Sequence, residues 1–176
     1  MNLRIVFFTL PGLLFSPFTV TAQNATLTLQ GEFFSGTCDV ALNGAQADGT
    51  VTLPKVSTDE LNQLKITGET TFYFTLTNCA SASNNWVIFY FEGGNTVDTT
   101  NYYVKNSDGS ATGVELILKT PGGNQIKPGT DTQAGENKFA DSRSGNFSVS
   151  YVTDNNIGPA TPGTVISHIT YHLEYK

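Results

Sequence analysis

The chain of 176 residues has few basic residues, and this shortage limits its choice of partners. Nine Lys and Arg stand against 15 Asp and Glu, so the formal net charge is −6 at pH 7. An acidic chain repels phosphate backbones, and no cluster of Lys and Arg is available for lipid headgroups. Nucleic acid is therefore not an expected partner.

Cysteine is equally scarce. The two cysteines, Cys38 and Cys79, are too far apart in sequence for a close-spaced metal or redox pair. In an oxidising compartment they would form one disulfide, and a loop of this length would stabilise the fold by roughly 4 kcal/mol. Two free buried thiols are the alternative.

The sequence also lacks the motifs that are typical of enzyme active sites. The sequence has neither a Gly-x-Ser-x-Gly elbow nor a Gly-rich phosphate loop. Its two histidines, His168 and His172, lie in a predicted strand, where four residues span about 13 Å, too far for one metal ion. The segment Asn106–Gly109 lacks the full ligand pattern of a calcium loop and is expected to form a hairpin turn. We expect no catalytic, cofactor-binding or metal site.

The one long apolar run lies at the start of the chain. A basic beginning, an apolar stretch and small residues at Val20 and Ala22 predict a signal peptide over residues 1–22. A membrane anchor is the alternative, but the run is short and contains Pro11 and Pro17. We therefore expect export, with a mature chain that begins at Gln23.

The rest of the chain alternates between apolar and polar residues with a period of two. This pattern predicts many short strands separated by Gly- and Pro-containing turns, which is typical of an all-β sandwich of one domain. Only residues 55–68 indicate helix, where Ser57 and Glu60 form a capping-box pattern. The predicted strands cover residues 24–30, 50–53, 71–78, 86–91, 102–104, 114–118, 147–151 and 165–175, and residues 32–40 are expected to be extended.

The two ends of the mature chain carry complementary strand patterns. Apolar or small residues share one face of each end strand: Ala25, Leu27, Leu29 and Gly31 in the first, and Ile169, Tyr171, Leu173 and Tyr175 in the last. A strand with an apolar face and a strand with an open edge are suited to strand addition. Periodicity leaves open whether the two strands pair within one chain or between chains.

Several segments in the same order resemble the chaperone–usher fimbrial subunits, especially major pilins of the type 1 and F17-like kind. The resemblance covers the mature chain and rests on residues 27–34 before Cys38, on residues 51–57 and 72–79, and more loosely on residues 113–116 and 126–129. It is closest at the C-terminus, where Tyr175 is penultimate and Gly163 is fourteenth from the end.

The resemblance implies an incomplete immunoglobulin-like β-sandwich that lacks its last strand and is completed by a donor strand from a neighbouring subunit. After the predicted signal peptide (1–22), it divides the chain into a donor strand (23–31) and a pilin domain (32–176). Ala25, Leu27, Leu29 and Gly31 would be the donor residues. The groove and the chaperone-recognition residues would be Gly163, Ile169, Tyr171, Leu173 and Tyr175.

The partners implied by the resemblance are identical or related fimbrial subunits, a periplasmic chaperone that anchors the carboxylate of Lys176, and an outer-membrane usher. The chain would cross the periplasm to a surface fimbria that supports cell adhesion. The alternative function is a self-contained secreted adhesin or carbohydrate-binding module, with binding loops around Tyr102, Tyr103, Asn155 and Asn156. A secreted hydrolase is a third option, but the sequence shows no set of catalytic residues that would support it.

Overall fold

A computed structural model of the chain describes residues 25–32, 38–78, 86–131, 133, 138–140 and 145–175. The predicted signal peptide lies outside these residues. Within them the elements are β1 (Ala25–Glu32), β2 (Asp39–Leu42), β3 (Gly49–Leu53), α1 (Thr58–Leu64), β4 (Ile66–Thr77), β5 (Trp86–Phe91), β6 (Val104–Lys105), β7 (Glu115–Lys119), β8 (Lys138–Ala140), β9 (Gly145–Val152) and β10 (Val165–Tyr175). No helix in the described part is long and apolar enough to cross a membrane.

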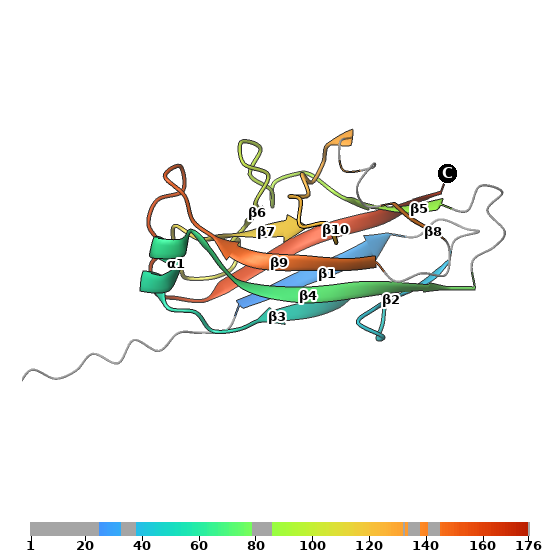
Figure 1. Cartoon of the computed structure of the whole chain (residues 1–176), viewed down its shortest axis with the longest axis horizontal. Coiled ribbons are helices and arrows are strands. Elements are labelled where there is room, and N and C mark those ends of the chain that lie inside the picture. The colour runs from blue at the N-terminus through green and yellow to red at the C-terminus, as the bar shows by residue number, and fades with distance from the viewer. Residues whose placement is uncertain are drawn as a thin grey trace, which may run out of the picture.

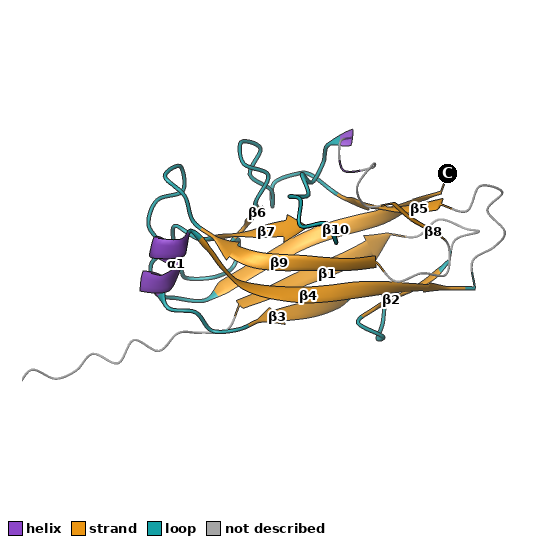
Figure 2. Ribbon diagram, viewed as in Figure 1, coloured by secondary structure: helices purple, strands orange, loops and turns teal. Residues whose placement is uncertain are grey.

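The strands form two five-stranded sheets, which confirms the predicted all-β class (Figure 2). The order is β3-β1-β10-β5-β8 in the first sheet and β2-β4-β9-β7-β6 in the second. Figure 1 shows α1 at one end of the molecule and the end of β10 at the other. The pair β1–β10 is parallel, whereas the other strand pairs are antiparallel.

An aromatic cluster joins the two sheets. Phe74 of β4 stacks on Phe89 of β5 with ring centroids 4.5 Å apart, and Tyr171 of β10 lies 4.7 Å from Phe74. All three are fully buried. Aromatic pairs at these distances add to the gain from burial alone. The core therefore lies between the sheets, and β10 contributes to its centre.

The helix begins where the capping pattern predicts. The Ser57 hydroxyl accepts a hydrogen bond from the Glu60 N–H at 3.0 Å, which satisfies one of the free donors of the first turn. Leu61 is buried, but Leu64 is 58% exposed. The helix therefore contributes one anchor to the core at its end of the sandwich.

One predicted strand, residues 102–104, is placed differently in the structure. Tyr102 has a φ of +60° and its N–H donates to the Asp98 carbonyl, so it belongs to a turn. The strand β6 begins only at Val104. Alternation of residue types does not detect a turn of this kind, because the turn depends on backbone conformation.

Candidate functional site: the N-terminal strand and its groove

β1 occupies an inner position of its sheet. It pairs in parallel with β10, from Ala25 opposite Val165 to Glu32 opposite His172, and antiparallel with β3. Figure 1 shows β1 and β10 running side by side in the same direction. Of the two pairings that periodicity leaves open, the single chain adopts the one within the chain.

The apolar face of β1 is buried in the core. Ala25, Leu27 and Leu29 are at most 1% exposed, and Gly31 is half-buried with its N–H donating to the Asp48 carboxylate at 2.8 Å. Complete burial of a leucine side chain is worth about 1.5–3 kcal/mol. Leu27 and Leu29 are therefore the main contribution of β1 to the core.

The facing side of β10 continues this buried surface. Ile169, Tyr171 and Leu173 are at most 5% exposed, while the alternate residues of β10 lie on the outer face. Ser167, opposite Leu27, is fully buried, and its hydroxyl has no hydrogen-bond partner among the described residues. The side chain of Tyr175 and the whole of Lys176 fall outside the described part of the chain.

Two tyrosine hydroxyls anchor the ends of this region. The Tyr151 hydroxyl accepts the N–H of Ala25 at 3.2 Å and donates to the Pro54 carbonyl at 2.9 Å. Burial raises the pKa of Tyr151 to about 12. The Tyr171 hydroxyl donates to the Ala47 carbonyl at 3.0 Å, and burial, followed by the nearby Asp48 charge, raises its pKa. Both hydroxyls therefore act as neutral hydrogen-bonding groups.

A cavity of about 230 Å³ lies at the α1 end of the sandwich. Its lining is mainly apolar and includes Leu61, Val114, Tyr151 and Val165. Tyr151 and Val165 are also the partners of Ala25, so the cavity adjoins the start of β1.

Gly163 lies in the segment before β10, where its backbone meets Ala111. A Cβ at position 163 would lie 2.5 Å from the Ala111 nitrogen, and the φ of Gly163 is +157°. A side chain there would collide with backbone atoms. Packing within the domain is thus one reason for glycine at this position, while its part in chaperone recognition stays a prediction.

The two histidines bind carboxylates on the outer face of β10. His168 Nε2 lies 2.8 Å from Asp108, while His172 contacts Glu92 and stacks on Tyr90. The two rings have different partners, in agreement with the prediction of two separate positions on the polar face of a strand. No group of residues suited to holding a metal ion is found in the described part of the chain.

Comparison with known proteins identifies the family of this chain and solved structures with a similar fold. The family model for Fimbrial protein matches residues 27–176. The chain belongs to the Fimbrial protein family. The P pilus rod subunit PapA resembles it with a TM-score of 0.56 and 17% identity, over 82% of this chain and 96% of PapA. A Burkholderia pseudomallei antigen and type I fimbria protein gives a TM-score of 0.42 and 24% identity, over 81% and 90% of the two chains. The comparison with curated proteins found no match.

The chain is therefore a structural subunit of a fimbria, with the immunoglobulin-like pilin fold seen in PapA. The family is structural, and its members associate with other pilus subunits in a pilus at the cell surface. The sequence resemblance is confirmed at the level of family and fold.

The predicted disulfide of this fimbrial subunit is described on one side only. Cys38 is buried immediately before β2. Cys79 follows β4 and lies outside the described residues. The antiparallel pairing of Asp39 with Thr77 places the start of β2 beside the end of β4. This is compatible with a bridge between Cys38 and Cys79. The Cys38–Cys79 disulfide stays a prediction.

The two loops that the alternative function would use for carbohydrate binding, around Tyr102 and around Asn156, contact each other in this fimbrial subunit. Asn156 donates to the Asn101 side chain at 3.4 Å, so the two loops touch. The ammonium group of Lys127 lies 5.6 Å from the ring centroid of Tyr102. One face of this ring is thus engaged by a cation–π contact.

The sequence pattern does not reveal two residues that hold β1 and β10 in place. Tyr151 holds the start of β1 across 126 positions of sequence. The sequence around Asn106 predicts only a turn, but the Asn106 side chain accepts a hydrogen bond from the backbone N–H of Ile166 in β10. A Gly or Asn in a turn signals backbone geometry, whereas its long-range partner is set by the tertiary fold.

Proposed function

We propose that this fimbrial subunit polymerises by donating β1 to the groove of a neighbouring subunit. The observation that carries the proposal is the position of β1, which lies between β10 and β3 and buries Ala25, Leu27 and Leu29 in the core. Donor-strand complementation of pilins is a known form of strand addition. Residues 23–31 would be the donor strand, and residues 32–176 the acceptor domain.

The connection of β1 makes such an exchange topologically simple. Removal of residues 1–22, as predicted from the sequence, leaves β1 attached to the fold only through the residues after Glu32. A strand held at one end leaves and enters a groove without threading. An equivalent strand from a second copy offers the same side chains, as in domain swapping.

Strand direction supplies a small driving force. Within one chain β1 is parallel to β10. Parallel pairing is slightly less stable per residue than antiparallel pairing. A donated strand is free to run antiparallel, and an alternating segment keeps the same residues on its buried face in either direction. A reversed strand would be antiparallel to β10, where β1 now makes eight residue pairs, but parallel to β3, where it makes five. Exchange between subunits therefore gives a small net gain in hydrogen bonding and retains the apolar contacts.

The same geometry indicates a need for assembly partners. Without β1, the facing edges of β10 and β3 lack a partner, and open edges promote aggregation. A periplasmic chaperone would cover the groove, recognise the region of Gly163 and Tyr175 and anchor the carboxylate of Lys176. An outer-membrane usher would receive the subunit and extend the fimbria, which would support cell adhesion.

Relocation of the donor strand tests the proposal. Residues 23–31 are deleted from the N-terminus and appended after Lys176 through a short Gly/Ser linker, which lets the strand fold back antiparallel to β10. We expect a monomer with a higher melting temperature than the native-order chain. The native-order chain should form polymers on incubation, as measured by light scattering after gel filtration.

A matched control keeps the relocated strand and replaces Leu27 and Leu29 within it by Asp, which should abolish the stabilisation. A native-order chain that stays an inert monomer and does not take up a synthetic peptide of residues 25–32 would rule out strand donation. That result would favour the self-contained adhesin.

A further inference from the structure

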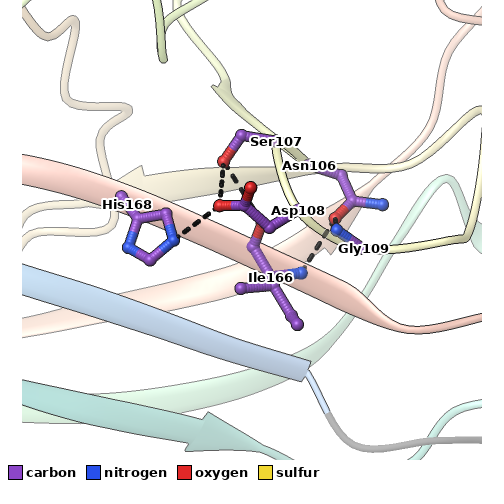
Figure 3. Close-up of polar contacts among 6 residues, drawn as sticks. All are labelled: Asn106, Ser107, Asp108, Gly109, Ile166 and His168. Carbon is purple, nitrogen blue, oxygen red and sulfur yellow. Dashed lines mark hydrogen bonds and ion pairs between the residues drawn. The ribbon is translucent and has the colours of Figure 1, made fainter.

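The two halves of β10 have different partners on the side away from β1. Residues Tyr171–Tyr175 pair with β5, but residues 165–170 have no strand on that side among the described residues. The segment Asn106–Ala111, here called the edge loop, lies along this part of β10 instead (Figure 3).

The edge loop replaces a neighbouring strand. The carbonyl of Ile166 accepts the N–H groups of Ser107 and Asp108 at 3.0 and 3.2 Å. The N–H of Ala111 donates to the Thr164 carbonyl at 3.0 Å. The backbone groups at the start of β10 that face away from β1 are thus satisfied by a loop.

The Asn106 side chain is the centre of this contact. Its oxygen accepts the N–H of Ile166 at 2.8 Å and that of Gly109 at 3.0 Å. Its NH₂ group donates to the carbonyls of Ala111 at 2.8 Å and Thr164 at 3.2 Å. All four hydrogen-bonding positions of the amide are used, and two of them bind the start of β10.

Two further contacts fix the loop against β10. A Cβ on Gly109 would lie 2.2 Å from the Thr164 carbonyl oxygen, so glycine is required for this close approach. Asp108 binds the ring of His168 at 2.8 Å (Figure 3). None of the edge-loop bonds to β10 involves β1, so departure of β1 from the groove removes none of these partners.

We propose that the edge loop, through Asn106, is a positioning element that keeps the first half of β10 extended while β1 is out of the groove. The inference rests on the proposed donor-strand function, because it concerns the empty acceptor groove. A strand held from one side remains a template for an incoming strand. Without the loop, this half of β10 would have to become ordered during strand uptake.

Hydrogen exchange of individual amides in the mature chain tests this directly. In the wild type, the amide of Ile166 should exchange more slowly than that of Leu27, because opening of β1 leaves the edge-loop bond intact. In Asn106→Ala, Ile166 should exchange roughly tenfold faster and together with Leu27. Equal exchange of the two amides in the wild type, or an unchanged difference in Asn106→Ala, would overturn the proposal.

Control variants separate positioning from general stability. Asn124→Ala removes an exposed turn amide and should leave both rates unchanged. Ile117→Val weakens the other sheet, so it should speed Ile166 only by the loss of global stability that urea unfolding measures, whereas Asn106→Ala should speed Ile166 by more than its own loss of global stability. If Asn106→Ala does not fold, Ser110→Ala replaces it. This milder variant removes the acceptor of the Thr164 N–H, so that amide alone should exchange faster, and an unchanged rate would count against the loop.

Uptake of a fluorescent peptide of residues 25–32 by the wild type is measured in parallel. Failure of uptake argues against the donor-strand function, whereas the ratio of the Ile166 and Leu27 rates still reports on the edge loop.

Discussion

The hydroxyl of Tyr151 lies 3.2 Å from the backbone nitrogen of Ala25 and so joins β9 of one sheet to the start of β1 in the other. The same oxygen donates to the Pro54 carbonyl, next to the end of β3. A single buried hydroxyl thereby fixes the position at which β1 enters the sandwich.

Tyr151→Phe should loosen the start of β1. The ring and its packing remain, but the Ala25 N–H and the Pro54 carbonyl each lose a partner. We expect a loss of about 1–2 kcal/mol in the free energy of unfolding and faster uptake of a β1 peptide. Urea denaturation and peptide binding measure the two effects. Tyr73→Phe, at a 39% exposed position, is the control and should change neither.

Leu27→Ala should destabilise the isolated chain through loss of core packing. Leu27 is fully buried, and truncation of a buried leucine to alanine costs about 2–5 kcal/mol. Thr28→Ala, on the opposite face of β1, should cost much less. Thermal unfolding of both variants checks the difference, and similar losses at the two positions would contradict the observed orientation of β1.

Glu115 should make the stability depend on pH. Burial, followed by the nearby charge of Asp98, raises the pKa of Glu115 to about 7, and its Oε2 has no hydrogen-bond partner among the described residues. The folded state therefore binds the proton more tightly than the unfolded state, whose pKa is near 4.5. This contribution to stability is complete below about pH 4.5 and is lost as the pH rises through about 7.

Urea unfolding of the wild type at several pH values between 5 and 8 should show this decline, and Glu115→Gln should remove it. Glu69→Gln, at an exposed position, should leave the decline in place. A decline that survives in Glu115→Gln would assign the effect to another group.

Gly163→Ala should lower the melting temperature of the isolated chain, because the new Cβ would lie 2.5 Å from the Ala111 nitrogen. A clash with backbone is relieved only by moving the segment before β10, and a loss of about 1–3 kcal/mol is expected. Gly122→Ala is the matched control, since its Cβ would meet only ordinary contacts at 3.7 Å. An unchanged melting temperature in Gly163→Ala would leave chaperone recognition as the reason for this glycine.

Local patterns predicted much of the fold. The helix cap at Ser57 and the buried face of β1 could be predicted because both depend on residues only a few positions apart in sequence. The turn at Tyr102 and the short strand β8 were not predicted, since both depend on contacts with distant segments. The edge loop was predicted only as a turn for the same reason.

The sequence by itself determined that Ala25, Leu27 and Leu29 form one face of a strand, because side chains alternate along any extended backbone. It also determined the matching face of β10 and the family resemblance. Only the tertiary structure decided that β1 lies parallel to β10 and beside β3, and that Asn106 supports the far side of β10. Periodicity is the same in both strand directions and for every possible partner, so the choice depends on how the whole sandwich packs.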